Sequence, residues 1–247
     1  FIFRTIEFEQ MEHQWFCKEG TDLQYYEEYK QKARNFLLSL GFSEDHLRFK
    51  DHDKLAHYAK SACDIQYLFP IGWSELNGIH DRTDYDLSRH QEYSGKNMNY
   101  LDPATGEKFI PYVVEYSIGA DRLMLAVLCE AYEEEELEGG DVRTVMHFHP
   151  ALAAYKAAVL PLQKNLSEKA KEIYKTLSKK FMVTYDEAGS IGKRYRRQDE
   201  IGTPFCITID FDTLENNTVT IRDRDTMSQI RLDIDEVASY IEKSLDF

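Results

Sequence analysis

The chain has 247 residues, of which 43% are hydrophobic and 13% aromatic, so it is long enough for one large globular domain or two ordinary ones. No stretch approaches the ~18 consecutive apolar residues of a membrane-spanning helix, which argues against a membrane protein. The four cysteines are scattered without a CxxC pair, which favours reduced thiols in a cytoplasmic protein over a disulfide framework. Because the chain starts within an alternating stretch and without methionine, we expect it to be the later part of a longer protein.

The net charge of −14 is unevenly distributed along the chain. Residues 1–143 carry 15 basic and 28 acidic side chains, whereas residues 144–247 carry 15 and 16. This asymmetry predicts two domains that meet near residues 139–141, and we place the boundary between residues 142 and 143. Any contact with a polyanion is expected in the second domain.

Residues 3–16 alternate in the manner of a β-strand, with Arg4, Phe8 and Glu12 on one face and Glu7 on the other. Both faces carry charge, although a half-exposed sheet needs only one polar face, so one charged row is expected to line a cleft. The alternative is an edge strand with both rows in solvent. Residues 22–40 have helical spacing and predict a surface helix.

Residues 64–86 predict a strand that reaches Trp73, followed by a hairpin turn at Asn77 and Gly78. Glu75 precedes this turn among apolar neighbours, so we expect it to be partly buried beside a cation or a hydrogen-bond donor. Five histidines between residues 46 and 90 lack the spacing of metal ligands, and no metal site is predicted. They are His46, His52, His57, His80 and His90.

Residues 112–132 combine an alternating strand, which ends at Gly119, with an apolar helix that starts directly after it. Glu115 and Ser117 project to the same side of this strand. Arg122 falls in the first helical turn, where the helix dipole disfavours a cation unless an anion lies nearby. The stretch therefore indicates an anionic-ligand site. The alternative, that Asp121 caps the helix and pairs with Arg122 while Glu115 is solvated, stays open.

The tract from Glu133 to Glu136 is expected to end this helix as a solvated face. Beyond it the pattern becomes α/β, with strands expected at 157–162, 182–185, 205–210 and 218–222 and helices at 167–180 and 235–245.

Residues 189–197 hold a compact basic patch interleaved with Tyr195, a mixture that suits phosphate contacts and base stacking. The alternative is a helix end balanced by Asp199 and Glu200. The basic residues are Lys193, Arg194, Arg196 and Arg197.

Taken together, these stretches resemble the glycyl-tRNA synthetases of the single-chain, dimeric type, within the class II aminoacyl-tRNA synthetases. Residues 3–16 resemble the second half of class II motif 2, residues 115–132 resemble motif 3, and residues 73–87 resemble the block between them. Residues 147–162 and 191–205 resemble the anticodon-binding domain. The resemblance implies an α+β fold, with a partial class II catalytic domain in residues 1–142 and an α/β anticodon-binding domain in residues 143–247.

The resemblance also implies a function. A protein of this family activates glycine with ATP and Mg²⁺ to glycyl-adenylate and transfers glycine to the 3′ end of tRNA(Gly), as a cytoplasmic homodimer. The implied ATP-binding residues are Phe3, Arg4, Glu7, Phe8, Glu75, Leu76, Gly119 and Arg122, with Arg4, Glu7 and Arg122 as the catalytic ones. The implied glycine-binding residues are Phe8, Glu12, Glu75, Glu115, Ser117 and Gly119. The implied tRNA-binding residues are Lys193, Arg194, Arg196 and Arg197.

The sequence departs from the family pattern because motif 1 and the first half of motif 2 are not in it, so we expect the isolated chain to be inactive. Two alternative functions fit the sequence less well. A non-catalytic, synthetase-like nucleic-acid-binding accessory protein is disfavoured by the retention of Glu12, Glu75, Glu115, Ser117 and Arg122 together. A class II synthetase for another amino acid is disfavoured by the three glutamates.

Overall fold

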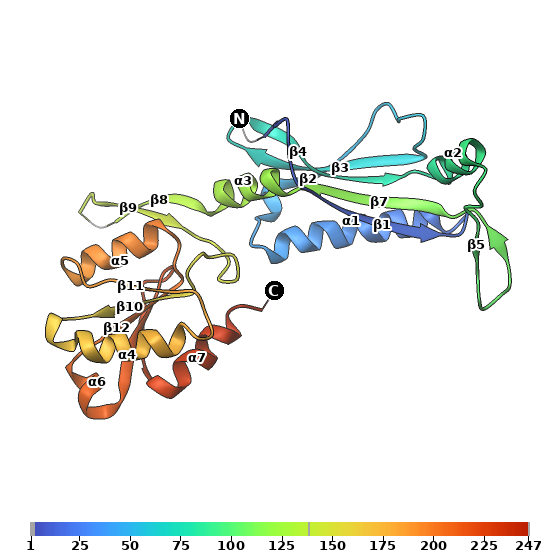
Figure 1. Ribbon diagram of the computed structural model, residues 1–247. Coiled ribbons are helices and arrows are strands. Elements are labelled where there is room, and N and C mark those ends of the chain that lie inside the picture. The colour runs from blue at the N-terminus through green and yellow to red at the C-terminus, as the bar shows by residue number, and fades with distance from the viewer. Residues whose placement is uncertain (1–2, 138, 247) are drawn as a thin grey trace. The chain divides into compact units, whose positions relative to one another are not determined.

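The computed structural model describes residues 3–137 and 139–246, and the chain divides into two compact units, Phe1–Cys129 and Glu130–Phe247 (Figure 1). The sequence-based boundary between residues 142 and 143 stays a prediction. Each unit is built around its own five-stranded sheet and its own buried core.

The sheet of the first unit is antiparallel, with the strand order β1-β7-β4-β3-β2. Its strands are β1 (Gln10–Cys17), β2 (Leu47–Asp51), β3 (Ser61–Phe69), β4 (Gly72–Asp81) and β7 (Tyr112–Gly119). Three helices accompany it: α1 (Asp22–Ser39), α2 (Tyr85–Ser94) and α3 (Ala120–Ala131). The short strands β5 (Tyr100–Leu101) and β6 (Lys108–Phe109) form a separate hairpin.

One face of this sheet is apolar and is covered by α1, which the helical spacing of residues 22–40 predicted (Figure 1). Leu37 of α1 and Ala126 of α3 are fully buried against Ile65 and Ile79 of the sheet. Because side chains alternate along a strand, the other face carries the polar residues.

The apolar face contains one buried acidic pair. Asp22 and Asp81 are both fully buried, and Lys60 forms an ion pair with Asp22. Burial raises the pKa of Asp81 to about 6, and the neighbouring carboxylate of Asp22 adds to the effect. Burial also opposes ionisation of Asp22, but its hydrogen bond from Lys60 helps to lower its pKa. Asp22 therefore keeps the negative charge of the pair at the lower pH.

Two local expectations for this unit are wrong. The strand predicted for residues 3–16 begins only at Gln10, so Arg4 and Phe8 lie in an irregular segment that leads into the sheet. Asn77 and Gly78 form no turn but lie inside β4, because the chain already reverses between β3 and β4, where Gly72 has a φ of +97°. A positive φ is accessible to glycine at little cost, which makes Gly72 the better turn residue.

The sheet of the second unit has the order β11-β10-β12-β13-β14, with β10, β11 and β12 parallel to one another and the last two strands antiparallel. The strands are β10 (Ala157–Pro161), β11 (Val183–Tyr185), β12 (Phe205–Ile209), β13 (Thr218–Asp223) and β14 (Gln229–Asp233). The helices are α4 (Ser167–Leu177), α5 (Ile191–Glu200), α6 (Phe211–Asn216) and α7 (Ile234–Lys243).

Helices cover both faces of this second sheet (Figure 1). Ile173 of α4 and Ile241 of α7 pack on one face, and Tyr195 of α5 packs on the other. The five residues of β10 and the five of β12 are all buried, as expected for central strands covered on both sides.

The acidic tract does not extend the helix, and that expectation is wrong. α3 ends at Ala131, and β8 (Tyr132–Glu136) pairs with β9 (Val142–Met146) as an antiparallel hairpin. Glu135 lies opposite Arg143, whose buried guanidinium donates two hydrogen bonds of 2.8 and 2.7 Å to the Glu135 carboxylate. This ion pair favours the hairpin over another helical turn, where acidic side chains would oppose the helix dipole.

Candidate active site

The polar face of the first sheet brings together residues from three strands. The register pairs Glu12 of β1 with Ser117 of β7, and Ser117 with Gly78 of β4. Two residues further along these strands, on the same side of the sheet, Glu115 of β7 pairs with His80 of β4. Directly paired residues point to the same side of a sheet, so Glu12, Ser117 and Glu115 share one face.

A β-bulge adds Glu75 to this face. The pairing of β3 with β4 shifts between Ile65 and Gln66, so that Asn77 lies opposite Ile65 while Glu75 lies opposite Gln66. Leu76 is the extra residue, and its side chain is buried in the core. Without the bulge, Glu75 would point to the apolar face, so the bulge places this carboxylate among the polar groups.

A cavity of about 240 Å³ lies at the end of this face, where β7 meets α3. Arg122, at the start of α3, lies with its guanidinium 4.4 Å from the centre of the Phe3 ring. The same guanidinium lies 3.3 Å from Glu75 Oε1 and donates a hydrogen bond of 3.0 Å to the Glu75 carbonyl. Glu75 thus supplies the anion that a cation at a helix N-terminus requires.

Most of the predicted ATP-binding residues line this cavity, namely Phe3, Arg4, Phe8, Glu75, Gly119 and Arg122. Ser117 from the predicted glycine-binding set also lines it. Glu7 does not line it, and neither do Glu12 and Glu115 from the predicted glycine-binding set. The side chain of Leu76 is buried, so Leu76 can offer a ligand only its backbone.

Glu115 has a different environment from the two other glutamates. It is 6% exposed, and Arg82 Nη1 donates hydrogen bonds of 3.1 Å to both of its carboxylate oxygens. Gln14 donates a third, also of 3.1 Å. The interaction with His80 and the guanidinium of Arg82 lower the pKa of Glu115 despite its burial, so the carboxylate is charged at neutral pH. Glu12 and Glu75, by contrast, are exposed, so the expectation that Glu75 is partly buried is wrong, although Glu75 does lie beside the cation Arg122.

The sequence reasoning missed Arg82, Gln14 and His80 as partners of Glu115. They lie 33, 101 and 35 residues from it, and only the strand register brings them together. The signal for this contact in the sequence is Arg82, a cation two residues after His80 and a candidate counter-ion for a buried carboxylate.

The predicted basic patch lies on α5 and does not form one exposed surface. Arg194 is 3% exposed, and its guanidinium donates to the carbonyls of Pro161 and Asp186. Arg196 pairs with Asp141, and Arg197 pairs with Asp186. Lys193 is exposed on the first turn of the helix. The expectation of four clustered surface cations is therefore wrong, because the fold buries one and pairs two.

A family comparison identifies the second unit. Residues 156–244 match the anticodon-binding domain family. The antiparallel sheet of the first unit, followed by this domain, confirms the predicted α+β fold class and is consistent with the C-terminal region of a class II aminoacyl-tRNA synthetase. No helix among residues 3–137 and 139–246 is long and apolar enough to cross a bilayer.

The chain is similar along its whole length to glycine–tRNA ligases, which confirms the predicted resemblance. It is 63% identical over 249 residues to that of Clostridium beijerinckii, 63% over 253 residues to that of Clostridium perfringens, and 59% over 249 residues to that of Geobacillus kaustophilus. Each alignment covers 100% of this chain and 54% of the relative, so the chain spans about half the length of these curated relatives.

Proposed function

We propose that this chain works within a glycine–tRNA ligase, in which it supplies the glycine site, one side of the ATP site and the anticodon-binding domain. The observation that supports this most directly is the convergence of Glu75 and Ser117 with Arg122 around one cavity on the polar sheet face. The similarity to glycine–tRNA ligases over the entire chain supports the same activity.

The nucleotide would bind at the end of the cavity that carries aromatic rings and arginines. Phe8 is 61% exposed and offers a free ring for stacking on adenine, while Arg122 and Arg4 offer positive charge to the phosphates. Mg²⁺ would accompany the triphosphate, because it is usually held by substrate phosphates and one or two carboxylates. Carboxylates of Glu9 and Asp121 also line this cavity.

Glycine would bind beside the nucleotide with its ammonium group toward the acidic residues of the sheet face. Glu75 and Ser117 line the cavity, and Glu12 lies directly opposite Ser117 in the register. Glu115, whose charge Arg82 already compensates, would contribute less to direct binding. A small cavity suffices for selectivity because no amino acid is smaller than glycine, so no editing site is needed.

The reaction needs no covalent enzyme intermediate. The glycine carboxylate attacks the α-phosphorus of ATP, and pyrophosphate leaves. A hydroxyl at the 3′ end of tRNA(Gly) then attacks the glycyl carbonyl of the adenylate, and AMP leaves. The residues of the chain hold the reactants in line and stabilise the charge on phosphate, which are the two contributions that this chemistry requires. A homodimer in the cytoplasm, the form expected from the sequence, is part of this proposal.

The test is glycine-dependent ATP–pyrophosphate exchange by the full-length protein. We expect exchange with glycine to exceed that with alanine or serine by more than ~10-fold. Arg122→Gln should lower the rate by ~100-fold, because it removes a positive charge beside the phosphates. Arg89→Gln, an exposed position on α2, is the matched control. Equal exchange with glycine and alanine would contradict the proposal.

The isolated chain provides a second test. We expect no measurable exchange from residues 1–247 alone, since the family's motif 1 and the first half of its motif 2 are not part of this sequence. Robust exchange by the isolated chain would show that these elements are dispensable.

A further inference from the structure

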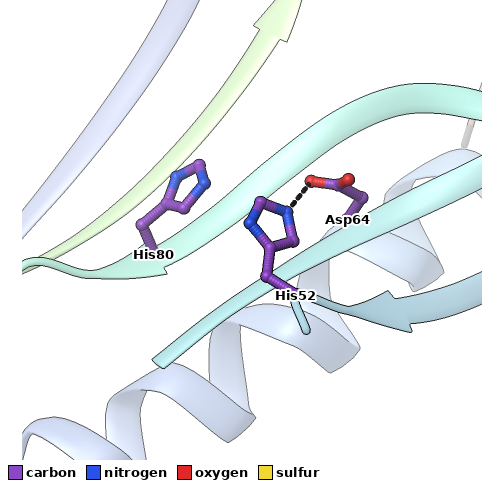
Figure 2. A group of neighbouring side chains, drawn as sticks. All are labelled: His52, Asp64 and His80. Carbon is purple, nitrogen blue, oxygen red and sulfur yellow. Dashed lines mark hydrogen bonds and ion pairs between the residues drawn. The ribbon is translucent and has the colours of Figure 1, made fainter. Parts of the chain in front are cut away.

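The polar sheet face carries a second group of side chains that the proposed activity does not use. His52 follows β2, Asp64 lies on β3 and His80 lies on β4, and one ligand atom from each lies within 4.8 Å of the others (Figure 2). His52 Nε2 is 2.8 Å from Asp64 Oδ1. Figure 2 shows the His80 ring turned toward the His52–Asp64 pair.

The strand register builds this cluster. Gly78 lies directly opposite Asp64, and the ring of His80 leans over Gly78 into the space that a side chain would otherwise fill. A Cβ at position 78 would come within 2.7 Å of the His80 Cε1 atom. Glycine at this position therefore allows the imidazole to lie beside the carboxylate of Asp64.

The electrostatics of the cluster favour a cation. Asp64 is half-buried, and the neighbouring cation Lys50 interacts with Asp53 at 3.4 Å. Among the hydrogen bonds of the described residues, the Asp64 carboxylate has only the imidazole of His52 as a side-chain partner. A bound metal ion compensates a partly desolvated carboxylate more fully than a single hydrogen bond from an imidazole does.

Glu115 orients the His80 ring from the other side. His80 Nδ1 is buried, forms no hydrogen bond within the described part of the chain, and lies 3.6 Å from Glu115 Oε1. A carboxylate that faces one imidazole nitrogen while the other faces an ion is the usual support of a ligating histidine. The arrangement leaves Nε2 of His80 for the ion.

We propose that His52, Asp64 and His80 bind one Zn²⁺ ion, with a fourth position open to water. Two imidazoles and one carboxylate match zinc, whereas calcium and magnesium prefer oxygen ligands alone. Ligand atoms at ~2.0–2.1 Å from a tetrahedral zinc are ~3.3 Å apart, so small side-chain rotations convert the observed cluster into a coordination site. The ion would tie the segment after β2 to the sheet beside Glu115.

A second histidine–carboxylate group, in the other unit, lacks these properties. His147 lies 3.3 Å from Glu133 and 3.1 Å from Glu135, but Arg143 already binds Glu135 through two hydrogen bonds. A guanidinium beside the site repels a metal ion. His147 is therefore the matched control for zinc binding at His52 and His80.

The experiment is a zinc titration of the purified full-length protein, stripped of metal with a chelator and then competed against a chromophoric chelator. We expect one Zn²⁺ per chain, with His52→Ala, Asp64→Asn and His80→Ala each weakening binding at least ~100-fold, since losing even a supporting residue costs 10–100-fold. His147→Ala and the exposed His90→Ala should bind zinc as the wild type does.

Further measurements distinguish the loss of a zinc ligand from the loss of the fold. Circular dichroism must show that the three variants are folded, and Zn²⁺ should raise the Tm of the wild type but not that of His80→Ala. Bound Co²⁺ should show visible absorption typical of a four- or five-coordinate site. A stoichiometry near zero would overturn the proposal and identify the cluster as a hydrogen-bonded group only. Unchanged affinity in His52→Ala and His80→Ala would overturn it too.

Discussion

The two units use charged residues in opposite ways. In the first, charged side chains such as Glu12 gather on one open face of an antiparallel sheet, and a cavity lies at the end of that face. In the second, cations that are neighbours on α5 are buried or paired: Arg194 is buried, and Arg196 and Arg197 form ion pairs with aspartates. A run of charge in a sequence therefore indicates a binding surface less reliably than separate charges that a strand register brings together.

The largest expected effect concerns the buried ion pairs of the second unit. Asp199 is fully buried and binds Arg222 at 2.8 and 3.0 Å and Arg143 at 3.4 Å. Asp199→Asn would leave two buried guanidinium groups undercompensated, so we expect a loss of ~3–5 kcal/mol in the free energy of unfolding, measured with urea. The exposed neighbour Glu200→Gln is the control. A loss below ~1 kcal/mol would show that the second unit does not depend on its interior charges.

The corresponding pair in the first unit should be weaker, because Arg82 is partly exposed. We expect Arg82→Gln to cost ~2 kcal/mol, since it leaves the carboxylate of Glu115 with less compensation. The double variant with Glu115→Gln should recover part of this loss, and urea unfolding of the four proteins gives the coupling energy. No recovery would mean that Arg82 stabilises the unit through other contacts.

The ion pair of Arg82 and Glu115 also predicts how stability depends on pH. The pKa of Glu115 is lowered in the folded protein, so its stabilising contribution is complete above the unfolded value of 4.5 and is lost as the pH falls through the folded pKa. In Glu115→Gln this acid-side loss should shrink, which urea unfolding between pH 3 and 6 would detect. A wild-type profile as flat as that of the variant would contradict the assignment.

The buried carboxyl of Asp81, beside Asp22, should give a pH dependence of stability of the opposite sign. Because the pKa of Asp81 is raised from 3.8 to about 6, its contribution to stability is greatest below pH 3.8 and falls as the pH rises to about 6. Asp81→Asn, which keeps an oxygen for the backbone N–H of Thr83, should raise stability above pH 6 by ~1–2 kcal/mol. Asp53→Asn, at a 92% exposed side chain, should change nothing. Destabilisation by Asp81→Asn at pH 8 would contradict this prediction.

The smallest expected effects concern Lys193 and Arg194 of α5, whose substitutions should change different properties. Lys193→Ala should weaken tRNA binding by less than ~10-fold and lower the salt dependence by about one phosphate contact. Arg194→Ala should instead lower stability, because it removes the donor to the Pro161 carbonyl. Filter-binding titrations at several salt concentrations, together with thermal unfolding, would distinguish them. If Arg194→Ala changed the salt dependence and Lys193→Ala did not, their assigned roles would be reversed.

Much of the fold followed from local patterns, and much of the site did not. The spacing of residues 22–40 predicted α1, and the positions of β10, β11, β12 and β13 were predicted to within one residue, whereas β8, β9 and β14 were not predicted. Local signals failed where tertiary contacts decided the outcome. Asn77 and Gly78 became part of a central strand, and the glutamate tract became β8 because Arg143 was opposite it.

In the candidate site, too, local sequence patterns could not predict the contacts that the tertiary structure makes. The family resemblance named Phe3, Arg4 and Arg122, and the structure brings them to one cavity. Residue spacing alone could not find the His52, Asp64 and His80 cluster, since its members are 12 and 16 residues apart and meet only through strand pairing. Patterns in the sequence reveal residues that are close along the chain, whereas these three residues are close only because their strands pair in the sheet.

The bulge at Leu76 makes β4 sensitive to a change of length. If β4 paired without the bulge, Leu76 would take a place in the regular alternation, and Glu75 would turn inward toward the core and leave Arg122 without its carboxylate. Substitutions along this strand alter one side chain each, but an inserted residue that no second bulge takes up would exchange the inner and outer faces of the segment before it. We therefore expect β4 to tolerate single replacements better than insertions.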